Sequence, residues 1–282
     1  MRNKVGCGSK MSHFVVGVIR DLKTDQTVDE LLEPYMENCA GTPDYKYMEF
    51  YDVEEKCRLN YETDTINMLR SPDDKIVFSW SKEVPKTEAG DEVPEGWVKI
   101  KMPAKVMYPT FEDYIENFCG YEKDPVEDRY GYWQNPNAKW DWWVIGGRWD
   151  GYFDGTNVIN VRDYDTSIDI EVYNTRYKEW KEWEDGKEFS FDENYDFAFY
   201  KPEYLKSLYK NAETYARFKA TPWMRAIVTP DGEWHEVGEM GWWGCSDETG
   251  DDMLDWVDHF AERFILPYSN GDYKITAVDC HI

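Results

Sequence analysis

Near-continuous apolar runs lie close to both ends of the chain. The first covers residues 14–19 and the last covers residues 273–279, and both are typical of β-strands in the middle of a sheet. If the two strands pair antiparallel, the start of the first lies beside the end of the last. The pattern therefore predicts that His13 lies near Asp279 and His281.

Helical spacing follows the first strand and precedes the last one. Thr27 and Glu30 form a capping box, which predicts a helix that continues to about Cys39. Thr110 caps a second helix, and residues 251–264 carry the apolar stripe of another. These helices have one apolar face each, so we expect them to pack on a sheet.

Turn signals divide two further regions into pairs of strands. Residues 76–80 and 97–100 predict a long-looped hairpin, and residues 224–229 and 233–237 predict a short one around Pro-Asp-Gly. Strands at both chain ends, with helices and hairpins between them, predict an α+β fold. The expected sheet is mainly antiparallel, with the two terminal strands central and the helices packed on it.

The length of 282 residues is that of one large domain or of a domain with one insertion. Residues 1–10 read as a polar extension, and residues 11–282 are predicted to form a single domain. The acidic and aromatic stretch 163–200 is the expected insertion.

Acidic residues outnumber basic residues 57 to 32, which gives a formal net charge of -25. This balance excludes a protein that binds duplex nucleic acid through a broad basic face. The aromatic content of 17% excludes an ordinary disordered acidic tail. No stretch approaches the roughly 18 apolar residues of a membrane span.

The six cysteines contain no Cys-x-x-Cys pair and match no zinc framework. No apolar segment follows the basic residues at the N-terminus, so no signal peptide is predicted. We expect reduced thiols, a cytoplasmic protein, no metal site and no cofactor.

Three fragments occur in an order that resembles a family of proteins encoded by bacteriophages and prophages. They are Met-Ser-His-Phe at 11–14, Asn-Pro-Asn-Ala-Lys-Trp-Asp-Trp-Trp with Gly-Gly-Arg-Trp at 135–149, and Val-Asp-Cys-His-Ile at 278–282. The resemblance implies a viral origin, action in the cytoplasm of an infected bacterium, and a usual start at Met11. It brings no fold, ligand or catalytic residue with it.

The densest aromatic stretch is residues 139–149, named here the tryptophan segment. Successive glycines let backbone N–H groups approach an anion, arginine binds anions in a bidentate manner, and indoles stack on rings. A nucleotide-like anion is the ligand that this set predicts, and the alternative is a buried aromatic cluster at a tight turn. The residues are Lys139, Trp140, Trp142, Trp143, Gly146, Gly147, Arg148 and Trp149, and we expect Trp242 and Trp243 to form a second wall.

His13, Asp279 and His281 form a second candidate site, because imidazoles and a carboxylate perform acid–base chemistry or bind a metal. Two-histidine phosphodiesterases use His-x-Thr or His-x-Ser repeats. Here Val15 follows Phe14, and Ile282 follows His281, so the repeat is missing. The alternative is a polar pair that ends two strands.

Three functions remain open. The first is a non-enzymatic binding protein that sequesters a small nucleotide-like anion, as a phage protein would to counter a host defence. The second is a direct inhibitor that binds a host defence protein through its acidic surface, with or without mimicry of DNA. The third is a small metal-dependent hydrolase built on the histidines. Self-association is also open.

Overall fold

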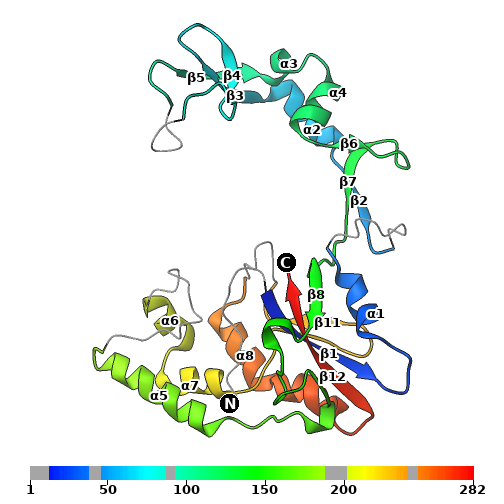
Figure 1. The fold of residues 1–282 in the computed structure, drawn as a ribbon, viewed down its shortest axis with the longest axis vertical. Coiled ribbons are helices and arrows are strands. Elements are labelled where there is room, and N and C mark those ends of the chain that lie inside the picture. Colours follow the sequence, from blue (N-terminus) through cyan, green and yellow to red (C-terminus); the bar gives the residue numbers. More distant parts are fainter. Residues whose placement is uncertain (1–12, 38–45, 87–92, 188–201, 240–246) are drawn as a thin grey trace. The chain divides into compact units, whose positions relative to one another are not determined.

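The computed structural model describes residues 13–37, 46–86, 93–187, 202–239 and 247–282 (Figure 1). The chain divides into two compact units. The first combines Met1–Tyr47 with Asn135–Ile282, and the second is Met48–Gln134. Helices and predominantly antiparallel sheets confirm the α+β fold.

Within the described residues, the first unit contains a six-stranded sheet with the terminal strands at its centre. Strands β1 (His13–Asp21) and β12 (Tyr273–His281) pair antiparallel along their whole length. Strand β10 (Ala226–Val228) is parallel to β1, and β11 (Trp234–Glu236) forms the edge beyond it. On the other side β12 pairs with β8 (Trp142–Ile145) and with β9 (Val158–Asn160). The predicted central pair of terminal strands is confirmed.

The alternation of side chains along β1 separates two apolar clusters, one on each face of the sheet. Val15 and Ile19 belong to the first cluster, whereas Phe14, Val16 and Val18 belong to the second. A continuous apolar run was therefore a correct sign of a strand with both faces covered.

Helices cover the first cluster, as Figure 1 shows on one side of the sheet. They are α5 (Ile170–Glu184), α6 (Pro202–Tyr209), α7 (Ala212–Ala220) and α8 (Gly250–Phe260), and α8 continues as η6 (Ala261–Ile265). The second cluster is covered by α1 (Val28–Leu32). The short turns of this unit are η1 (Glu33–Tyr35), η3 (Gly147–Trp149), η4 (Val161–Asp163) and η7 (Leu266–Tyr268).

Local sequence signals explain where α1 begins and ends. The Thr27 side chain accepts a hydrogen bond from the Glu30 N–H, and the Glu30 carboxylate accepts one from the Thr27 N–H, so the capping box is confirmed. The helix stops at Leu32 and not near Cys39, because Pro34 in η1 lacks an N–H donor.

The second unit consists of two small sheets and short helices, described here by themselves. One sheet orders β4 (Ile76–Phe78), β3 (Thr65–Arg70) and β5 (Val98–Pro103); the other orders β2 (Glu49–Asp52), β7 (Tyr130–Gln134) and β6 (Glu122–Lys123). The helices are α2 (Glu54–Thr63), α3 (Ala104–Met107), α4 (Phe111–Asp113) and η2 (Tyr114–Phe118).

The long-looped hairpin predicted for the second unit is wrong in its pairing. Strands β4 and β5 each pair with β3, which lies between them. The buried residues Ile66 and Met68 of β3 alternate with exposed Thr65 and Asn67, and this alternation is too short to predict a strand from the sequence.

The expected division of the chain also differs from the structure. A single domain with an insertion at 163–200 was predicted, but the second compact unit is Met48–Gln134. Helix α5 lies inside the proposed insertion and packs against α7, with Trp180 and Trp183 buried in the first cluster. These two tryptophans therefore belong to the main core. None of the helices described here has the length and apolar character of a membrane span.

Candidate functional site

Two histidines and two aspartates meet at the end of the six-stranded sheet where β12 terminates. The group is named here the histidine site and comprises His13, Asp141, Asp279 and His281. The antiparallel register places His13 opposite His281, and their ring centroids are 4.8 Å apart in an edge contact. The prediction that His13, Asp279 and His281 lie together is thereby confirmed.

Asp279 is the buried anchor of this group, since only 2% of its side chain is exposed. Its Oδ1 lies 2.8 Å from His13 Nδ1, and its Oδ2 accepts a hydrogen bond of 2.9 Å from the Arg148 backbone N–H. An ionised carboxylate only accepts hydrogen bonds, so the proton of the neutral His13 ring resides on Nδ1. Nε2 is then the atom of His13 that can take up a proton.

Asp141 holds the second imidazole in the same manner. Its Oδ1 lies 2.7 Å from His281 Nδ1, and it stands in the chain directly before β8. This pair is more exposed than the first, with 27% of the His281 side chain and 37% of the Asp141 side chain accessible. Sequence reasoning missed Asp141, because its contact depends on the pairing of β8 with β12, which no local pattern indicates.

Trp142 forms the aromatic wall of the site. Its indole stacks on His281 with an interplanar angle of 14° and meets the edge of His13 with ring centroids 5.0 Å apart. The residue remains 43% exposed. The site is therefore most open at Trp142 and the His281–Asp141 pair, and becomes buried towards Asp279.

Of the two glycines of the tryptophan segment, Gly147 brings the backbone close to a carboxylate, and that carboxylate is Asp279. Gly146 and Gly147 have φ angles of 74° and 55°, which glycine adopts at little cost. A Cβ on Gly147 would lie 2.4 Å from Asp279 Oδ2. The chain's own carboxylate therefore occupies the position that was predicted for an external anion.

The four tryptophans of the tryptophan segment do not form one pocket. Trp140 is buried in the second cluster, where its Nε1–H donates to the Leu32 carbonyl, and Trp143 packs against the same cluster. Trp149 lies in the first cluster, on the opposite face of the sheet. The period of two along β8 and the turn after it direct these side chains apart, which leaves Trp142 at the site.

The remaining predicted residues have different positions. Lys139 forms an ion pair of 2.7 Å with Glu236 and belongs to a separate groove. Arg148 is exposed and contributes its backbone N–H to the histidine site. Trp242 and Trp243 lie outside the described residues.

Cys280 stands between Asp279 and His281 in the chain but points to the other face of the sheet. It is fully buried in the second cluster, and burial, together with the Asp279 charge, raises the pKa of its thiol well above the ordinary value. Thiol nucleophiles need thiolate character and access, so Cys280 is a packing residue.

Among the residues that the structure describes, no cluster of His, Cys, Asp or Glu has the arrangement of a metal centre. Comparisons of the chain with protein-family models, curated proteins and solved structures give no match. Function must therefore be argued from the geometry of the site.

Proposed function

We propose that the histidine site performs acid–base chemistry on a phosphodiester of nucleotide type. The observation that carries this proposal is a pair of imidazoles in ring contact, each with its Nδ1 held by a carboxylate. A carboxylate in this position fixes the tautomer and orientation of the ring and stabilises its protonated form.

Two adjacent imidazoles suit a displacement at phosphorus that needs one base and one acid. One imidazole takes the proton of the attacking hydroxyl or water through Nε2, and the other, as imidazolium, gives a proton to the leaving oxygen. The P–O bond to the attacking oxygen forms as the bond to the leaving oxygen breaks. The better shielded His13–Asp279 pair is assigned to the base and the more exposed His281–Asp141 pair to the acid.

Two neighbours support a nucleotide-like substrate. Trp142, 43% exposed, offers an aromatic surface beside His281, and bases stack on such surfaces. Arg148 is exposed and lies at the same end of the sheet, where its backbone N–H donates to Asp279 Oδ2. With the resemblance to phage proteins, this suggests a signalling nucleotide of the host as the biological target.

Binding without turnover is the second candidate, and the limited exposure of His13 favours it. Only 10% of this side chain is accessible, so a ligand seated on Trp142 would reach Nε2 with difficulty. In that case the protein sequesters the nucleotide without cleaving it. The carboxylate–imidazole pairs then hold the shape of the site.

The test combines melting curves with product analysis for a panel of linear and cyclic dinucleotides. Catalysis predicts product formation that falls about 10²- to 10⁴-fold in His13→Gln, together with a melting shift that Trp142→Ala weakens. His259→Gln, on the outside of α8, is the matched control and keeps full turnover. A melting shift without product supports sequestration. The absence of both a melting shift and a product contradicts both functions.

A further inference from the structure

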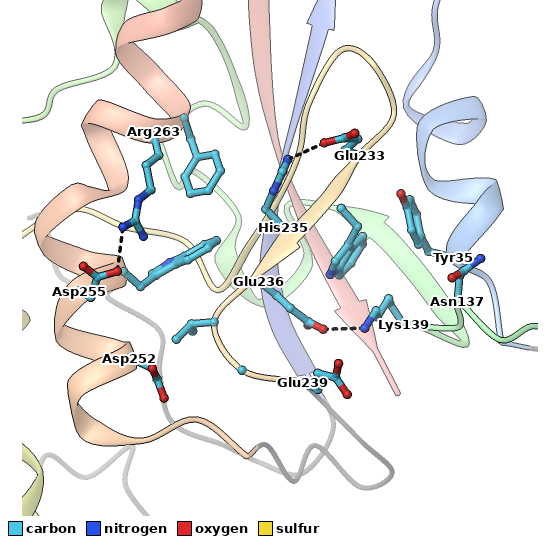
Figure 2. Close-up of a pocket in the computed structure, with 15 residues that line it drawn as sticks. Tyr35, Asn137, Lys139, Glu233, His235, Glu236, Glu239, Asp252, Asp255 and Arg263 are labelled. Carbon is cyan, nitrogen blue, oxygen red and sulfur yellow. Dashed lines mark hydrogen bonds and ion pairs between the residues drawn. The ribbon is translucent and has the colours of Figure 1, made fainter.

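A second candidate site lies around the edge strand β11, away from the histidine site. It is an open groove of about 880 Å³, named here the β11 groove, and none of its lining residues belongs to the histidine site. Figure 2 shows the labelled side chains on two opposing walls, with Glu236 between them. One wall carries Tyr35, Asn137 and Lys139, and the other carries Asp252, Asp255 and Arg263.

The lining of the groove comes from both faces of the sheet. Trp234 and Tyr35 pack against the second cluster, whereas Trp256 and Phe264 belong to the first. Strand β11 has β10 as its neighbour on one side and forms the outer edge of the sheet order on the other. A chain laid along such an edge directs successive side chains to alternate faces, so both walls would receive side chains.

Carboxylates dominate the chemistry of this groove. Five acidic residues line it, against the two cations Lys139 and Arg263 and the imidazole of His235. Arg263 is engaged with Asp255 at 2.8 Å. Hydrogen bonds from Thr249 hold the pKa of the Asp252 carboxyl below its ordinary value, so this residue stays charged over a wider range of pH.

Glu236 provides an independent indication of a ligand. Only 6% of its side chain is exposed, and its Oε1 pairs with Lys139 Nζ at 2.7 Å. Its Oε2 is buried and has no hydrogen-bond partner among the described residues, and the same holds for Trp234 Nε1. A buried carboxylate oxygen without a donor is costly, and a ligand that brings an ammonium or guanidinium group removes that cost.

We propose that the β11 groove binds an extended, basic peptide segment of a partner protein, which adds as a strand along β11. A lysine or arginine of the peptide donates to Glu236 Oε2, and the neighbouring side chains enter the wall of Asp255, Trp256 and Phe264. The excess of carboxylates in the groove favours a basic occupant. The lining from both faces of the sheet favours an extended one. The inference does not depend on turnover at the histidine site.

The experiment measures fluorescence anisotropy of a labelled peptide of about eight residues, the length of an ordinary strand, in which lysine alternates with valine. The expected result is saturable binding that weakens with salt and weakens at least tenfold in Glu236→Gln. Glu213→Gln, an exposed position on α7, is the matched control and keeps the affinity.

Two further probes decide between a strand and a simple cation. A peptide of the same charge with proline at its central valine lacks one backbone N–H, so it binds less tightly if the segment pairs with β11. Spermine tests the charge alone. The proposal is overturned if spermine and the proline peptide bind as tightly as the original lysine–valine peptide. It is also overturned if Glu236→Gln keeps its affinity for that peptide while circular dichroism shows that the variant is folded.

Discussion

In the histidine site each carboxylate holds one imidazole, whereas in the β11 groove carboxylates outnumber the cations. Both regions lie on the same six-stranded sheet, the first where β12 ends and the second at the edge strand β11. In the histidine site the carboxylates orient rings, whereas the groove has more carboxylates than cations, and we propose that this excess receives a basic peptide. The net charge of -25 alone does not distinguish these uses.

The largest expected effect is on the buried end of the histidine site. Asp279→Ala removes the acceptor of both His13 and the Arg148 N–H, and each buried donor left without its acceptor costs about 1–3 kcal/mol of unfolding free energy. Urea unfolding measures the loss. Asp272→Ala is the control, because this exposed partner of Arg162 is expected to contribute less than about 1 kcal/mol. Equal losses would show that Asp279 is no anchor.

A smaller loss is expected when the backbone approach to Asp279 is blocked. Gly147→Ala combines a left-handed φ with a Cβ 2.4 Å from Asp279 Oδ2, so we expect a cost of about 1–3 kcal/mol. Gly155→Ala is the control: its φ is +97°, but nothing lies within 4 Å of the added Cβ. Thermal melting of both variants separates the close contact from backbone strain alone, and identical melting temperatures would contradict the contact.

The next prediction concerns the β11 groove and its ion pair between Lys139 and Glu236. Lys139→Met removes the donor to the buried Glu236 carboxylate, and the lost charge-assisted hydrogen bond costs about 1.5–3 kcal/mol. Lys75→Met, whose exposed partner Asp73 lies 3.5 Å away, should leave urea unfolding unchanged. Because Glu236 then carries an uncompensated charge, the basic peptide should bind more tightly to Lys139→Met; weaker binding would contradict the proposed contact.

The smallest effect concerns Glu37, next to the histidine site. Burial, followed by the charge of Asp141, raises the pKa of its carboxyl above the ordinary 4.5. The Glu37 carboxyl therefore contributes favourably to stability below its pKa in the unfolded chain. This contribution is lost as the pH rises through the raised pKa of the folded protein. Glu37→Gln should therefore melt higher than the wild type at neutral pH and equally at about pH 4. Glu213→Gln is the control for the loss of one negative charge. An equal rise of its melting temperature at neutral pH would show that the effect at Glu37 has no local cause.

The sequence predicted the centre of the fold better than its surroundings. The apolar run of β1 and the last strand carry strong local signals, so their pairing, and with it the meeting of His13 with Asp279 and His281, was predictable. Asp141 was not, since its contact with His281 joins residues 140 positions apart. The prediction that the tryptophans form one pocket was wrong, because composition does not show that Trp140 and Trp149 lie on opposite faces of a sheet.

The second unit and the groove show the same limit. Strand β3 alternates with polar residues and depends on β4 and β5 for its place, so pattern alone did not reveal it. The buried Oε2 of Glu236 is a consequence of packing that no spacing in the sequence can indicate. Both are properties of tertiary context, which overrides local propensity.

The pairing of β1 with β12 has a consequence for biosynthesis. The contact between His13 and Asp279 spans 266 positions, so β1 leaves the ribosome long before its main partner exists. Until then its apolar residues are available for wrong contacts, and closure of so long a loop slows folding. The histidine site thus forms only after nearly the whole described chain has been made.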